Sequence, residues 1–140
     1  MALSYEAKLL SGITLLAVPT IMYGGWTLLG ILTHGAVAPM ARGLNLNETQ
    51  WALWRAGHAH AGVWVLLSLV VQILLDSARL SSGLRWLARI SAPLAAVAMS
   101  AGLFGVAFVP AFRWLLYLGA ISLAVSVILT GIGLLRNLRA

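Results

Sequence analysis

The chain has no cysteine, a single aspartate and only three acidic residues among its 140 positions. The absence of cysteine excludes disulfides, thiolate metal sites and thiol nucleophiles. The shortage of carboxylates, together with the lack of a serine in a nucleophile elbow, gives little support to a hydrolytic enzyme. Charged residues make up only 9% of the chain, which is too few to keep so apolar a chain soluble as a monomer.

Apolar residues form 61% of the chain, and the mean hydropathy is +0.98. We therefore predict an integral membrane protein of the all-α class with a single domain over residues 1–140. Four stretches are long enough to cross the roughly 30 Å hydrocarbon core as helices. Their connections are short, which favours an antiparallel four-helix transmembrane bundle or arc. The predicted helices span residues 10–37, 50–75, 86–109 and 112–135.

Local signals refine the first two helices. Asn47, followed three residues later by Gln50, is typical of a capping box, so we expect this pair to open the second helix. Pro19 lies inside the first apolar run, where we expect a kink. That run is too long for a signal peptide, and Glu6 balances Lys8 before it, so we predict a helix of the mature protein.

Small and polar residues predict how the helices pack. Short side chains let membrane helices approach closely, and they recur in the third and fourth predicted helices. We expect Gln72 in the second helix to form a hydrogen bond to a neighbouring helix. The small residues are Ala98, Ala101, Gly102 and Gly105 in the third helix, and Ser122, Ser126 and Thr130 on one stripe of the fourth.

The cations indicate the orientation, because Lys and Arg gather on the cytoplasmic side of membrane proteins. Six cations fall on the side of the termini and three on the other. This predicts cytoplasmic termini, and histidines near the outer face of a membrane that we expect to be a bacterial plasma membrane. The net charge of +6 then reflects topology and contact with membrane lipids, with no nucleic acid as partner. The six are Lys8, Arg79, Arg85, Arg89, Arg136 and Arg139, and the three are Arg42, Arg55 and Arg113.

The segment from Arg55 to Gly62 places His58 and His60 in an otherwise apolar stretch. Ionisable groups inside a membrane need a reason, and cofactor ligation is a common one. On a helix, residues two apart diverge by roughly 200° around the axis and lie about 3 Å apart along it. The two imidazoles therefore point to nearly opposite sides, and one metal ion cannot easily take both.

This divergence leaves three interpretations open. Copper or zinc would need one of the two histidines together with His34 of the first helix, with Met40 as a further soft ligand. A porphyrin is a different case, because two separate porphyrins, one on each side of the helix, can each be ligated by one imidazole. The third interpretation is a cofactor-free accessory or transport subunit whose histidines line a polar cavity or a partner interface.

The sequence His58-Ala59-His60-Ala61-Gly62-Val63-Trp64-Val65-Leu66 resembles the His-x-His helix of haem-copper oxidase subunit I and of the nitric oxide reductase large subunit. In that family, adjacent histidines ligate two different haems. The subunit is built from three four-helix arcs around a pseudo-threefold axis, with the haem-ligating pair on the second helix of an arc. The resemblance covers one helix of the four, and its specific element is the histidine pair.

The resemblance implies haem b held axially by His58 and His60. Haem cannot be attached covalently here, since the chain has no cysteine. The chain also departs from the family: only His34 remains for the family's copper centre, so oxygen reduction of the oxidase type is not implied. A homotrimer would mimic the three arcs, with His58 of one protomer and His60 of the next on one haem. A twofold dimer bridged by one haem is the alternative.

Arginines near the histidine pair complete this hypothesis. Arg55 lies about one turn before His58, and Arg113 opens the fourth helix at a position that resembles the family's outer-loop arginines. Each is a candidate to hold a haem propionate, or simply reaches lipid headgroups. His34 is a candidate ligand, a hydrogen-bond partner of a propionate, or an interfacial residue without a role. We expect electron transfer more than substrate turnover, with a redox partner or quinone that the sequence does not identify.

Overall fold

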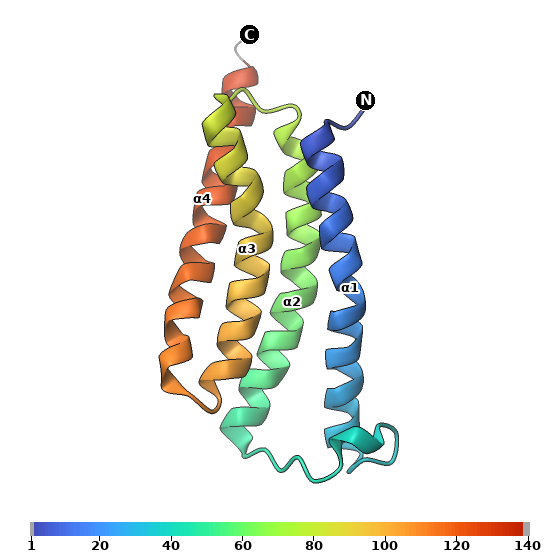
Figure 1. The fold of residues 1–140 in the computed structure, drawn as a ribbon. Helices are drawn as coiled ribbons and strands as arrows, with labels where there is room; N and C mark the ends of the chain where they lie inside the picture. Colours follow the sequence, from blue (N-terminus) through green and yellow to red (C-terminus); the bar gives the residue numbers. More distant parts are fainter. Residues whose placement is uncertain (1, 139–140) are drawn as a thin grey trace.

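The alternation of long apolar runs and short connections folds into four long helices, shown in Figure 1. This computed structural model describes residues 2–138. The order along the chain is α1 (Tyr5–Leu32), η1 (Pro39–Ala41), α2 (Glu48–Leu75), α3 (Ser82–Val106), η2 (Pro110–Phe112) and α4 (Arg113–Asn137). All four long helices have the length and hydropathy of membrane spans, which confirms the predicted all-α transmembrane fold.

The helices stand side by side in a row and run alternately up and down (Figure 1). Each packs against the next in the chain, α2 also contacts α4, and α1 also contacts α3. Within residues 2–138, α1 and α4 do not contact each other, so the row is an open arc. We call the end that carries the first and last described residues the terminal end, and the opposite end, with η1 and η2, the histidine end.

The bounds of α1 differ from the prediction. The helix begins at Tyr5 rather than Leu10, because the Ser4 side chain accepts a hydrogen bond from the Ala7 N–H and caps it. It ends at Leu32 rather than Val37. The predicted end rested on hydropathy alone, which extended the helix past Thr33. In the structure the chain turns after α1, and His34 has a positive φ of 51°.

The start of α2, at Glu48 rather than residue 50, follows its capping chemistry, whereas the bounds of α3 and α4 differ from the prediction by up to four residues. The capping box at the start of α2 is confirmed: Gln50 N–H donates to Asn47 Oδ1 at 2.9 Å, and Asn47 N–H donates to Gln50 Oε1 at 3.1 Å. The third helix begins at Ser82 rather than residue 86 and ends at Val106 rather than 109. The fourth begins at Arg113 rather than residue 112 and ends at Asn137 rather than 135.

Small residues bring α3 and α4 close together, as predicted. A Cβ added to Gly119 of α4 would lie 2.8 Å from the backbone N of Met99 in α3. Ser126 Oγ donates to the Ala88 carbonyl at 2.9 Å. Ser122, Ser126 and Thr130 are all buried on this stripe. Backbone proximity therefore fixes this pair of helices, while the exposed apolar side chains of α1 and α4 face outward.

A buried polar cluster joins three helices at the terminal end. The Arg89 guanidinium pairs with the Asp76 carboxylate, and it also donates to the carbonyl and the side-chain oxygen of Gln72, each at 3.0 Å. Gln72 donates in return to the Arg89 carbonyl at 2.9 Å, which confirms its predicted contact with a neighbouring helix. Ser4, just before α1, donates to Asp76 through its hydroxyl at 2.7 Å and its N–H at 2.9 Å. The cluster holds α1, α2 and α3 together.

Candidate functional site

His58 lies in the seam between α1 and α2, facing two adjacent glycines of α1. A Cβ added to Gly25 would lie 3.0 Å from both Cε1 and Nε2 of the imidazole, and one added to Gly24 would lie 3.7 Å from Nδ1. The ring therefore rests where α1 has no side chains. Within residues 2–138, neither ring nitrogen of His58 has a hydrogen-bond partner.

The depth of His58 makes this lack of partners notable. It is ten residues into α2, hence about 15 Å along the axis from the start of the helix at 1.5 Å per residue. The surrounding helix faces are apolar. An unpaired polar group in such a place costs free energy, so a ligand or water that occupies its nitrogens would lower the energy of the site.

Three hollows meet at His58. The Trp51 hollow, of about 660 Å³, lies toward the histidine end. The Met22 hollow, of about 540 Å³, lies on the Gly25 side of the ring. The Ser100 hollow, of about 310 Å³, lies between α1, α2 and α3 on the Gly24 side. All three volumes lie within the range of ordinary small-molecule sites, which runs from about 300 to 1,000 Å³.

The Ser100 hollow adds two polar residues, Thr20 and Ser100, that the sequence analysis did not single out. Thr20, His58 and Ser100 line it among apolar neighbours. The Ser100 hydroxyl is buried and has no hydrogen-bond partner in the described part of the chain, while Thr20 donates to its own helix at the Ala17 carbonyl. Ser100 Oγ and the His58 ring are thus two polar groups on this hollow that lack hydrogen-bond partners among the described residues.

His60 points elsewhere and is held by its own helix. Its Nδ1 lies 2.7 Å from the Ala56 carbonyl oxygen, which can only accept, so this nitrogen carries the hydrogen. In the neutral ring Nε2 then keeps a free lone pair. The ring also meets Trp64 edge to face at 5.3 Å. His60 is not among the residues that line the three hollows at His58, in line with the opposite directions expected on a helix.

Arg55 and His58 line one hollow together. Both border the Trp51 hollow, with Trp51 and three leucines of α1, Leu28, Leu29 and Leu32. The Arg55 side chain is exposed and has no ion-pair partner within residues 2–138. The hollow therefore offers an imidazole at its inner side, a free guanidinium and an aromatic ring, which suits a flat apolar molecule that carries carboxylates.

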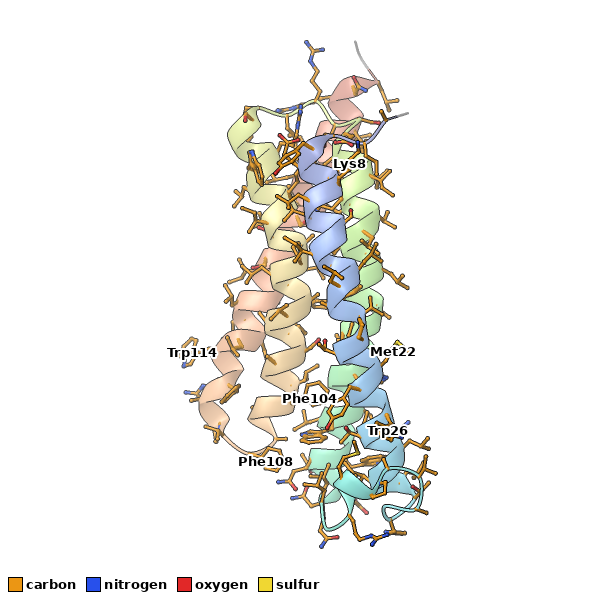
Figure 2. All side chains as sticks on the ribbon, turned by 45° about the vertical axis from the view of Figure 1, so that its right-hand side comes forward. Lys8, Met22, Trp26, Phe104, Phe108 and Trp114 are labelled. Atoms are coloured by element: carbon orange, nitrogen blue, oxygen red, sulfur yellow. The ribbon has the colours of Figure 1, made fainter. Side chains whose placement is uncertain are left out.

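The other predicted site residues lie outside this arrangement. His34 is exposed in the turn after α1, and Met40 is exposed in η1; neither lines a hollow at His58. Arg113 is exposed at the start of α4, with its guanidinium 5.6 Å from the Trp114 ring centre. Figure 2 shows Trp114 pointing outward from the arc. Among the described residues, no group of three or more His, Asp or Glu could hold a metal ion.

Aromatic residues close the α2–α3 seam at the histidine end. Trp54 meets Phe104 and Phe108 edge to face, at 5.4 and 5.9 Å. Figure 2 shows these two phenylalanines toward the same end as Trp26. The Trp54 ring therefore lies between helices, and its Nε1 is buried without a partner among the described residues.

Comparisons of the chain with models of protein families, with curated proteins and with solved structures give no match.

Proposed function

We propose that this protein binds haem b in the membrane and has an electron-transfer role, with His58 and His60 as axial ligands. The observation that carries the proposal is the His58 imidazole, which is deep in an apolar seam, has no hydrogen-bond partner among the described residues and borders three hollows. A half-buried imidazole that lacks a hydrogen-bond partner and faces apolar helices is well suited to metal ligation, because coordination supplies the missing interaction.

His60 supports the proposal through its tautomer. An imidazole that ligates a metal usually donates its other N–H to a carbonyl or carboxylate, which fixes the ring and raises its basicity. The contact between His60 Nδ1 and the Ala56 carbonyl has this form and leaves Nε2 for iron. The Trp64 ring restricts the imidazole further.

Arg55 is the residue of this chain that would hold a haem propionate, since it borders the same hollow as His58. Its guanidinium can form two parallel hydrogen bonds with a carboxylate. Arg113 is a second candidate at the same end of the arc. Bound haem with two histidine ligands supplies one-electron redox chemistry without an open iron position, which favours electron transfer over substrate turnover.

The opposite directions of His58 and His60 imply more than one chain per haem. In the proposed homotrimer, His58 of one protomer and His60 of the next hold one haem, which uses every pair without breaking symmetry. The open arc, in which α1 and α4 do not meet within residues 2–138, leaves both flanks available for neighbouring protomers. A twofold dimer is the alternative assembly. The cytoplasmic termini and the bacterial plasma membrane belong to the same proposal.

The test is the absorption spectrum of the detergent-purified protein, oxidised and then reduced with dithionite, with haem quantified as the pyridine complex. We expect a low-spin haem b spectrum at one haem per protomer. His58→Ala and His60→Ala should each lose it, while His34→Ala, in an exposed turn, is the matched control and should keep it. Native mass spectrometry of the same samples should give a trimer.

A colourless protein after expression with a haem precursor and haem supplementation would overturn the proposal. Copper or zinc bound in stoichiometric amount to the colourless protein, and lost in both His34→Ala and His58→Ala, would replace haem with the metal interpretation. Neither chromophore nor metal would favour a cofactor-free accessory subunit. Equal haem in His58→Ala and wild type would remove His58 as a ligand.

A further inference from the structure

At the terminal end, the loop after α2 and the last turns of α4 enclose a hollow of about 480 Å³ lined by Arg79, Leu80, Ser81 and Arg136. We call it the Arg79–Arg136 hollow. It lies at the far end of the arc from His58 and shares no lining residue with the hollows there. Two guanidiniums on one small hollow suggest an anion as its occupant.

Two hydrogen bonds, one between backbone groups and one from a side chain, hold the two sides of this hollow together. The Arg79 N–H donates to the Gly133 carbonyl of α4 at 2.9 Å, and the Asn137 side chain donates to the Ser77 carbonyl at 3.0 Å. Gly133 permits the approach, because a Cβ there would lie 2.8 Å from the side chains of Ala78 and Leu80. These hydrogen bonds hold the loop against the end of α4, so that Arg79 and Arg136 line the same hollow.

Within residues 2–138, no carboxylate neutralises the positive charge of the hollow. Neither Arg79 nor Arg136 has an ion-pair partner within residues 2–138, where the pair between Arg89 and Asp76 is the single salt bridge. Asp76 is already engaged by Arg89 and Ser4. Glu6 lies on α1, which does not contact α4 in the described chain.

Neighbouring groups add to the attraction for an anion. Arg85 donates to the Leu80 carbonyl at 3.3 Å, which brings a third guanidinium to the same loop. The hydroxyl of Ser81, the residue before α3, makes no capping hydrogen bond and is exposed on the hollow. The hollow thus combines cations with a hydroxyl donor, the groups that recognise phosphate.

The position favours a lipid as the source of the phosphate. Helix α2 has 28 residues, about 42 Å at 1.5 Å per residue, and so exceeds the roughly 30 Å hydrocarbon core. The loop that follows it therefore lies at headgroup level. Ile132, exposed on α4, lies four residues before Arg136 and so on the same face one turn deeper. A phosphate at Arg136 would leave its acyl chain alongside Ile132.

From these contacts we propose that the Arg79–Arg136 hollow binds the phosphate of an anionic phospholipid headgroup. The site differs from a general attraction of basic residues to a membrane surface, because it forms only where the loop after α2 packs against the end of α4. It is independent of haem, and its test does not depend on the outcome of the haem experiment.

The test is native mass spectrometry of the full chain in detergent with phosphatidylglycerol or phosphatidylcholine added. We expect selective retention of phosphatidylglycerol, weakened several-fold in Arg136→Gln and at least tenfold in the Arg79→Gln/Arg136→Gln double variant. Arg42→Gln removes the same charge at the histidine end and is the matched control, with retention as in wild type. Arg136→Lys should keep most of the retention.

Three results would overturn the proposal. The first is equal retention of the two lipids by wild type. The second is an equal loss in Arg136→Gln and Arg42→Gln, which would show attraction to net charge alone. The third is displacement of phosphatidylglycerol by inorganic phosphate at equal concentration, which would make a soluble anion the occupant. Unchanged thermal unfolding of the exposed-arginine variants verifies that their fold is intact.

Discussion

The Asp76 carboxylate and the Arg89 guanidinium form an ion pair at the terminal end of the arc, with 10% and 1% of their side chains exposed. The pair joins the C-cap residue of α2 to the second turn of α3. Gln72 and Ser4 supply hydrogen bonds to the same two groups. The pair therefore stabilises the fold chiefly by compensating charges that the packing has already buried.

Removal of one partner should be costly. Asp76→Asn keeps the shape of the side chain but leaves the buried Arg89 charge uncompensated, and we expect a loss of about 3 kcal/mol in unfolding free energy. Glu48→Gln removes an exposed carboxylate in the first turn of α2 and should cost less than about 1 kcal/mol. Denaturant unfolding in mild detergent measures both, and similar losses in the two variants would contradict the assigned role.

Acid should weaken the same contact. Burial alone raises the pKa of the Asp76 carboxyl, but hydrogen bonds from Ser4 and the nearby Arg89 guanidinium outweigh it and bring the pKa below its usual value. Because the pKa is lower in the folded state, the contribution of Asp76 is complete above the unfolded pKa of about 4 and disappears as the pH falls through the folded pKa.

The measurement is the unfolding midpoint of wild type and Asp76→Asn between pH 7 and pH 3. We expect the difference between the two proteins to be constant near neutrality and to shrink below about pH 4. A difference that stays the same down to pH 3 would show that Asp76 does not gain stability from ionisation.

Adjacent glycines of α1 provide a matched pair for the site. A Cβ at Gly25 would lie 3.0 Å from the His58 imidazole, whereas one at Gly24 would lie at an ordinary 3.7 Å. If haem is bound as proposed, Gly25→Ala should displace the ring and lower haem per protomer at least twofold, while Gly24→Ala should retain it. Haem is measured as the pyridine complex. Equal retention in both variants would show that the seam does not position His58.

Two glycines of α4 test the packing of the arc. Gly119→Ala would place a methyl group 2.8 Å from the Met99 backbone and should cost about 1–3 kcal/mol through overpacking. Gly131→Ala meets nothing within 4 Å and should be neutral or stabilising by up to about 1 kcal/mol, because alanine favours the helix. Thermal unfolding compares them. Equal changes in unfolding temperature for the two variants would show that Gly119 does not lie at the α3–α4 contact.

Sequence alone determined the class of fold and much of the local structure. Four apolar runs predicted the four helices, Asn47 and Gln50 predicted the start of α2, and Gln72 predicted a hydrogen bond to a neighbouring helix. The opposite directions of His58 and His60 also followed from their spacing once the segment was helical. These features depend on residues close together in the chain, so their cause is visible in the sequence.

Tertiary structure decided what each of these side chains meets. The sequence counted Arg89 as one of the topology-setting cations, but folding buries it against Asp76, 13 residues away. Gly24 and Gly25 became the wall opposite His58, and Arg79 and Arg136 became two sides of one hollow. Hydropathy also failed to predict that α1 ends at Leu32. The reason is that apolarity and caps act within a segment, whereas the partner of a buried polar group depends on how distant segments pack.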